Sequence, residues 1–228
     1  GGVITGGTGT DISTFGGTTW YCGGGALIKN GGSLTMMGGN IIGCSAECGG
    51  GVCIDSEQGQ FSMSGGSIAG CVASDIGGGV FASGKFQMSD KAVIRSCTAG
   101  RTSFNCGGGV YVDGSFEMSG EAIIEGCQAI STSSNSSNGG GVYVSSSSSF
   151  VMTAKAEIEG CRAISNSAIS SKGGGVHLAN NTEFTLSGSA VIQNCKAVNS
   201  DGSGKAYGGG VSAACVWEIT LEDNASIA

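Results

Sequence analysis

The cysteines are the residues with the most distinctive chemistry in this sequence, which has 11 of them in 228 residues. Six recur at one position of a repeated motif, three residues after an Ile and two before an Ala: Cys44, Cys71, Cys97, Cys127, Cys161 and Cys195. These apolar neighbours predict small buried side chains that fill a turn. A disulfide ladder or a strip of metal ligands is the alternative. Zinc sites usually contain C-x-x-C pairs or a nearby His, which this column lacks, so we expect no metal and no cofactor.

The remaining cysteines could form covalent cross-links. Cys22, Cys48 and Cys106 each come immediately before a glycine triplet, and Cys22 and Cys48 would occupy the same place in adjacent repeats. Their expected Cα separation is compatible with a disulfide. Cys53, which alternates outward, and Cys215 could cross-link neighbouring chains in an oxidising compartment.

Seven glycine triplets define the repeat that positions these side chains. They are spaced 26 to 35 residues apart, and the consensus that follows each is V-x-V, a short gap, F-x-M-S-G and then A-x-I-x-G-C-x-A. A repeat of this length indicates a solenoid, in which each unit packs only on its neighbours. We expect one solenoid domain over residues 1–228, with partial coils at both ends, uncapped ends and about seven coils that start near residues 23, 49, 77, 107, 139, 173 and 208.

Alternating apolar and polar residues within each repeat predict three short strands per coil and an all-β fold. The same apolar residue recurs at equivalent positions of successive repeats. These columns include Val52, Val80, Val110, Val142, Val176 and Val211; Phe61, Phe86, Phe116, Phe150 and Phe184; and Ile41, Ile68, Ile94, Ile124, Ile158, Ile192 and Ile227. Such columns are expected when coils stack about 4.8 Å apart in a parallel β-helix. The length variation falls after each C-x-A, so we expect loops that project from one corner and lengthen toward the C-terminus.

Two outward columns are candidates for contact or catalysis. Phe81, Tyr111, Tyr143 and His177 form a predicted surface stripe of aromatic rings, which we interpret as the best contact surface. In the third strand, an outward column contains Arg95, Glu125 and Glu159. This column is typical of a solvated ion-paired face; a polysaccharide-active enzyme is the alternative, although clustered acids in a groove with aromatic platforms would be expected there.

Composition excludes several classes of function. The net charge is −7, and the ten Lys and Arg are scattered along the sequence, so we expect no nucleic-acid partner. No stretch approaches the ~20 apolar residues of a transmembrane helix, so we expect no membrane insertion by this segment. The glycine triplets lead into strands without a following Lys-Ser or Lys-Thr, which disfavours phosphate binding.

The GGG(V/A), F-x-M-S-G and I-x-G-C repeats resemble adhesin-like right-handed β-helix proteins, including autotransporter passengers. Among named families they are similar to the polymorphic outer membrane proteins of chlamydiae, although Ser64, Ser89 and Ser119 stand where that family's F-x-x-N signature has Asn. The resemblance implies a right-handed coil and an extracellular or cell-surface location, either outer-membrane-associated or secreted. We therefore expect a non-catalytic adhesin-like segment that contacts a protein or glycan on a cell surface. A self-assembling filament or sheath subunit, which stacks head to tail or laterally, is the alternative.

Overall fold

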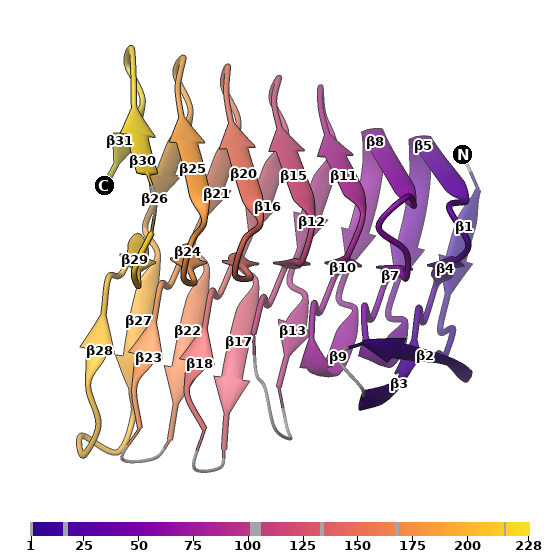
Figure 1. Ribbon diagram of the computed structural model, residues 1–228, viewed down its shortest axis with the longest axis horizontal. Helices are drawn as coiled ribbons and strands as arrows, with labels where there is room; N and C mark the ends of the chain where they lie inside the picture. Colours follow the sequence, from indigo (N-terminus) through magenta and orange to yellow (C-terminus); the bar gives the residue numbers. More distant parts are fainter. Residues whose placement is uncertain (1, 16–17, 101–105, 133–134, 167–168, 217) are drawn as a thin grey trace.

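The protein is an elongated stack of β-strands, known from a computed structural model that describes residues 2–15, 18–100, 106–132, 135–166, 169–216 and 218–228, without the side chains of residues 12–18. The described residues form 31 strands and no helix. Every strand pair is parallel except the hairpin of β2 (Asp11–Phe15) and β3 (Thr18–Cys22). Successive coils lie side by side along the long axis (Figure 1), as the repeat predicts.

A seven-stranded sheet contains one short strand from each coil, directly after each glycine triplet. Its strands, in chain order, are β4 (Ala26–Ile28), β7 (Val52–Ile54), β10 (Val80–Ala82), β14 (Val110–Val112), β19 (Val142–Val144), β24 (Val176–Leu178) and β29 (Val211–Ala213). Each valine of the predicted column is paired with the valine of the next coil. This column is confirmed.

A thirteen-stranded sheet provides two further sides of the coil. Two long strands, β5 (Ser33–Ile42) and β8 (Gln60–Ala69), cross both sides, and β1 (Val3–Thr5) pairs with β5. In later coils the F-x-M side consists of β11 (Lys85–Met88), β15 (Ser115–Met118), β20 (Ser149–Met152), β25 (Glu183–Leu186) and β30 (Glu218–Leu221). The Ile side consists of β12 (Val93–Arg95), β16 (Ile123–Glu125), β21 (Glu157–Glu159), β26 (Val191–Gln193) and β31 (Ser226–Ile227).

An eight-stranded sheet adds a further strand to each full coil. The two coils that contain β5 and β8 have three described strands each, and the later full coils have four or five, so the prediction of three strands per coil needs correction. Besides β2 and β3 it contains β6 (Ser45–Cys48), β9 (Val72–Ile76), β13 (Thr98–Ala99), β17 (Gln128–Ser131), β22 (Arg162–Ser165) and β27 (Lys196–Asn199). The sequence around C-x-A indicated a turn, but its alanines pair in register from coil to coil. The stacked backbone groups pair here because an unpaired buried N–H or C=O would cost free energy.

The segments that were predicted as loops form extended arms in the C-terminal coils. A fifth strand returns along each arm and builds a three-stranded sheet of β18 (Ser137–Asn138), β23 (Ser171–Lys172) and β28 (Ala206–Tyr207). The arms project from one edge of the stack (Figure 1). Ser137 and Ser171 are fully buried inside them and donate hydrogen bonds to the carbonyls of Ile164 and Val198 in the next coil. The serine-rich composition thus supplies small residues that fill a narrow interior and satisfy backbone carbonyls.

Residues in the left-handed region form the corners between these sides. The first glycine of each triplet has φ between +57° and +68°, a conformation that costs other residues energy. A second corner stacks Asp90, Gly120, Ala154, Gly188 and Asp223, all at positive φ. These residues turn the chain at the same place in each coil, so the strands keep their register.

The main core fills the space between the seven-stranded sheet and the two sides of the thirteen-stranded sheet. Five phenylalanines form one stack, with ring centroids 4.8 to 5.1 Å apart: Phe61, Phe86, Phe116, Phe150 and Phe184. Their neighbours are stacked Met and Leu on the same strands and the Ile column opposite. Like side chains pack on like side chains because the strand spacing is also a favourable distance between rings. Within the described part of the chain, no helix is long and apolar enough to cross a membrane.

Candidate functional site

A second, smaller core lies outside the main one, between the outer face of the seven-stranded sheet and the residues that precede the triplets. We call it the outer core; its buried members are Cys22, Cys48, Cys53, Ile76, Phe81 and Cys106, packed with Trp20, Leu27, Tyr111 and Tyr143. Two columns meet in it. One points outward from the seven-stranded sheet, in the order Leu27, Cys53, Phe81, Tyr111, Tyr143 and His177. The other immediately precedes the triplets, in the order Cys22, Cys48, Ile76, Cys106, Asn138 and Lys172.

The prediction of an exposed aromatic contact surface is wrong for Phe81 and His177, which are buried, and Tyr111 and Tyr143 are only partly exposed. Phe81 is 1% exposed and His177 is 7% exposed, while Tyr111 and Tyr143 are partly buried. Their rings stack on one another, with centroids 5.4, 4.8 and 5.5 Å apart from Phe81 through Tyr111 and Tyr143 to His177. Alternation along the strand correctly places these residues outside the main core. It does not show that the preceding strand folds back over them.

His177 is held in its neutral form. Burial, with the nearby charge of Lys172, lowers the pKa of the imidazole to about 4. Its Nδ1 atom is buried without a hydrogen-bond partner, and the ring borders an open hollow that Lys172 and Tyr207 also line. A neutral imidazole at neutral pH can accept a hydrogen bond, but the described residues beside it include no carboxylate that would orient it as a catalytic base.

Three cysteines of the outer core converge at its N-terminal end. The Sγ atoms of Cys22, Cys48 and Cys53 all lie within 4.8 Å of one another, and the residues are 1%, 0% and 0% exposed. Cys22 and Cys48 are direct partners in the pairing of β3 with β6, so the register that a disulfide between them requires is present. The Cys22–Cys48 disulfide remains a prediction for the oxidised chain, in which these two sulfur atoms could not bind a metal as thiolates.

Burial corrects the prediction that Cys53 cross-links neighbouring chains. Its thiol lies inside the outer core, out of reach of another molecule. Cys215 is exposed, so a cross-link from Cys215 to a neighbouring chain remains a prediction. Cys106 lies in the outer core near Asn138, whose side-chain amide donates to the sulfur at 3.5 Å, and burial raises the pKa of its thiol to about 12.

The six repeat cysteines line the main core, and only Cys195, in the last of these coils, is partly exposed. Each of these thiols except Cys44 contacts two backbone carbonyls. One belongs to the residue two positions earlier in the sequence, and the other to the Ile of the preceding coil. For Cys127, the Sγ atom lies 3.5 Å from the carbonyl oxygen of Glu125 and 3.9 Å from that of Ile94. Burial raises the pKa of Cys127, so this thiol stays protonated and donates. Burial and the carbonyl contacts make each cysteine of this column a small, mainly apolar core side chain.

The acidic residues near the Arg95 column, which the enzyme alternative would use, form a surface network. Glu125 and Glu159 continue the column of Arg95 in register. Asn194 donates a hydrogen bond to Glu159 at 3.2 Å, and Gln193 donates to Glu157. The ion pairs found among the described residues join Lys85 to Glu117 and Lys155 to Glu121, on the solvent-facing side. An ordinary surface partner is thus present for Glu117, Glu121, Glu157 and Glu159.

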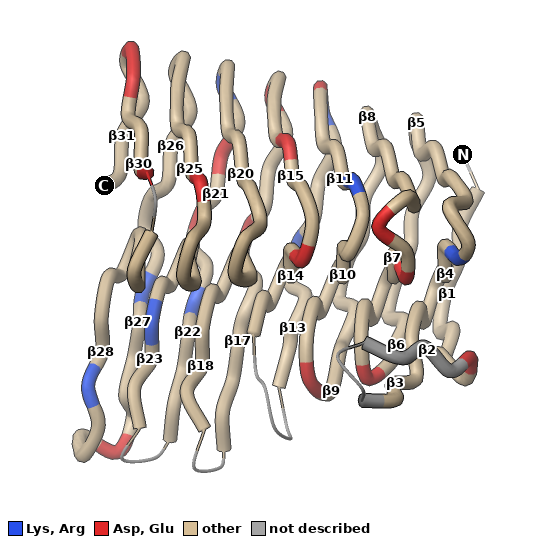
Figure 2. Tube along the Cα trace, viewed as in Figure 1, with Lys and Arg blue, Asp and Glu red and all other residues tan. Residues whose placement is uncertain are grey.

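Folding gathers positive charges that are scattered in the sequence. Arg162 on β22 and Lys196 on β27 are register partners, and both are exposed. Lys172 on β23 and exposed Lys205, next to β28, lie on the returning strands of the same arms. Figure 2 shows these positive segments on the C-terminal arms, where an acidic segment also lies near the tip of the last arm, while most of the other acidic segments lie on the opposite edge and in the N-terminal coils. We call these four residues the basic arm surface. Sequence spacing could not predict it, because the pairing of the arms was not expected.

Comparison with known proteins adds no identity to this site, because no family model, no curated protein and no solved structure matches the chain.

Proposed function

We propose that this chain is a non-catalytic, adhesin-like segment of an extracellular or cell-surface protein. In this proposal it is a right-handed parallel β-helix, whose stacked coils provide a stiff support and whose arms make the contacts. The resemblance of its repeats to adhesin-like β-helix proteins supports the handedness and the location. Continuous side-chain columns support stiffness, since each coil can shift only by breaking contacts on both sides.

The basic arm surface is the observation that carries the choice of partner. Four cationic residues lie on the C-terminal arms of a chain of net charge −7, and Arg162, Lys196 and Lys205 are exposed. A local positive surface attracts anionic groups even when the whole protein is acidic. Arg and Lys both bind sulfates and carboxylates, so we propose an acidic glycan of a cell surface as the partner. The buried aromatic stripe no longer contributes to this contact.

Binding of a sulfated polysaccharide, with heparin as the probe, tests the proposal. The triple variant Arg162→Ser, Lys196→Ser and Lys205→Ser should bind heparin at least about tenfold more weakly, and wild-type binding should fall with added salt. The control variant Lys29→Ser, Lys91→Ser and Lys155→Ser removes the same charge from exposed positions elsewhere and should bind normally. Equal losses in both variants would contradict a local site.

Two observations on the same samples separate the other functions. Regular fibres in negative-stain micrographs would favour a self-assembling filament, since the adhesin-like proposal expects short rods. Release of new reducing ends from a polysaccharide would favour a β-helix enzyme. We expect neither.

A further inference from the structure

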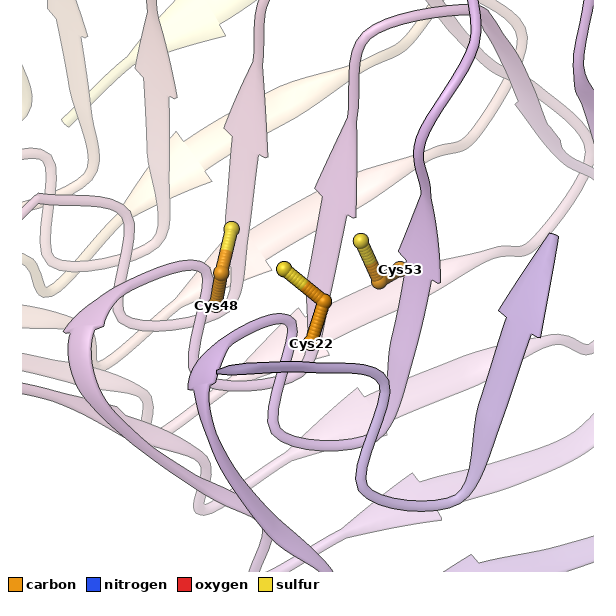
Figure 3. A group of neighbouring side chains, drawn as sticks. All are labelled: Cys22, Cys48 and Cys53. Carbon is orange, nitrogen blue, oxygen red and sulfur yellow. The ribbon is translucent and has the colours of Figure 1, made fainter. Parts of the chain in front are cut away.

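The three-cysteine group of the outer core has the geometry of a metal site. Figure 3 shows the side chains of Cys22, Cys48 and Cys53 next to one another, with their sulfur atoms toward the same space. The three Sγ atoms lie within 4.8 Å of one another. Around a metal with bonds of about 2.3 Å, three sulfur atoms in a plane lie about 4.0 Å apart. The thiols would therefore need to approach by no more than about 0.8 Å.

The repeat geometry brings these residues together from three strands. Cys22 ends β3 and Cys48 ends β6, one coil apart, while Cys53 is the middle residue of β7. Between Cys48 and Cys53 the chain reverses at the triplet, with Gly49 at φ +63°. A Cβ on Gly49 would lie 3.0 Å from the Cα of Cys53, so glycine permits the close approach of the two columns. The group is therefore fixed by backbone pairing on each side.

The environment of the group disfavours free thiolates. Burial raises the pKa of Cys48, and the hydrogen bond with Cys22 together with burial raises the pKa of Cys53. Asp55 adds a negative charge nearby, which acts in the same direction. These shifts keep Cys48 and Cys53 protonated at neutral pH, and a cation that binds sulfur strongly can replace their protons.

We propose that Cys22, Cys48 and Cys53 bind one soft metal ion, Cu(I), through three sulfur atoms. Soft thiolate ligands select Cu(I) and zinc among biological metals. Zinc in structural sites almost always takes four ligands, and among the described residues no fourth Cys, His, Asp or Glu belongs to the group. Burial of all three thiols also restricts access of water as a fourth ligand. Cu(I) is stable with three sulfur ligands, so the coordination number decides between the two metals.

Binding involves no change of oxidation state. Cu(I) enters as Cu(I), each thiol that becomes a thiolate releases its proton to solvent, and three copper–sulfur bonds form. Affinity should therefore fall as the pH is lowered, because protons compete for the same sulfur atoms. The site is independent of the basic arm surface, so failure of one proposal leaves the other standing.

The test is an anaerobic titration of the reduced full chain with Cu(I), in competition with a colorimetric Cu(I) chelator. We expect about one Cu(I) per chain, with a sulfur-to-copper charge-transfer band in the ultraviolet. Cys22→Ser, Cys48→Ser and Cys53→Ser should each weaken binding at least about tenfold. Cys106→Ser, a buried outer-core thiol outside the group, and exposed Cys215→Ser are the matched controls and should bind as the wild type does.

Three results would overturn the proposal. The first is no stoichiometric uptake by wild-type protein whose circular dichroism shows the folded β structure. The second is an equal loss of binding in the control variants, which would indicate scattered thiols. The third is tighter binding of Zn²⁺ than of Cu(I) in the same competition, which would contradict three-coordinate ligation. Circular dichroism of each Ser variant separates loss of the ligand from loss of the fold.

Discussion

The phenylalanine column gives the sharpest prediction about stability. Phe116 is fully buried, and its ring stacks on Phe86 and on Phe150 with centroids 4.8 Å away on each side and interplanar angles of 4° and 5°. Replacing a buried Phe by Ala typically costs about 3–5 kcal/mol. Because Phe116 has a ring on both sides, we expect Phe116→Ala to lie in the upper half of that range.

A matched variant isolates the contribution of stacking. Phe184 is also buried, but it has one ring neighbour, Phe150 at 5.1 Å, and its other register partner is Ile219. A ring pair contributes about 0.5–1.5 kcal/mol beyond buried area, so Phe184→Ala should cost less than Phe116→Ala by about that amount. Phe116→Leu keeps most of the apolar volume and should cost less than either.

Urea denaturation followed by circular dichroism measures these differences, with the slope m checked for each variant. A change in m would show that some coils unfold separately, as repeat proteins can. A cost below about 1 kcal/mol for Phe116→Ala, with m unchanged, would refute the buried ladder.

Three further predictions concern glycine, alanine and histidine positions. Gly78→Ala should lower the free energy of unfolding by about 2 kcal/mol or more, because a Cβ there would clash with the carbonyl oxygen of Gly108. The control Gly38→Ala has open space around it and should be nearly neutral. The midpoints of urea denaturation of the two variants measure the difference. Ala154→Gly should stabilise by about 1 kcal/mol in the same assay, because Ala154 has φ +61° in a corner column that has Gly120 and Gly188 on either side, and a loss of stability would contradict the assigned corner. His177 has a pKa of about 4 in the folded protein, below its value of about 6.5 in the unfolded chain. Its contribution to the free energy of unfolding is therefore complete above pH 6.5 and is lost as the pH falls toward 4. His177→Phe, which keeps the stacked ring, should remove this part of the pH dependence of stability. NMR titration of the imidazole, the only one in the chain, should show the lowered pKa directly. A measured pKa near 6.5 would contradict the burial of His177.

The inner columns could be predicted because stacking repeats the same environment in every coil. Val110, Phe116 and Ile124 each recur in neighbouring repeats and pair in register with their counterparts. A solenoid is one of the few folds in which sequence alignment alone gives the spatial neighbours of a residue. The columns of the coil were therefore predicted without knowledge of the chain's path.

The outer core could not be predicted from alternation alone. A period of two tells which face of a strand a side chain is on, but it does not tell what covers that face. Tyr111 and Cys53 point away from the main core, and the strand before each triplet folds over their column. A signal was present in Cys22, Cys48, Ile76 and Cys106, an apolar column directly before the triplets, which indicates a second buried face.

The paired strands of the arms could not be predicted from the sequence for a different reason. Segments rich in Ser and Asn usually indicate loops, and here their short side chains pack inside paired strands. Pairing with the neighbouring coil outweighs the weak strand propensity of the isolated segment. The charges of Arg162 and Lys196 became neighbours only through this pairing.

Equivalent positions of all coils lie in straight columns along one axis. Exposed Ser33 and Glu218 are the two ends of one column, six strand spacings apart, and exposed Gln60 and Glu183 lie four spacings apart in the same column. Pulsed electron paramagnetic resonance between genetically encoded spin-labelled residues at each pair should give backbone distances of about 29 and 19 Å, a difference of about 10 Å. Broad distributions, or equal distances for the two pairs, would contradict the stacked solenoid.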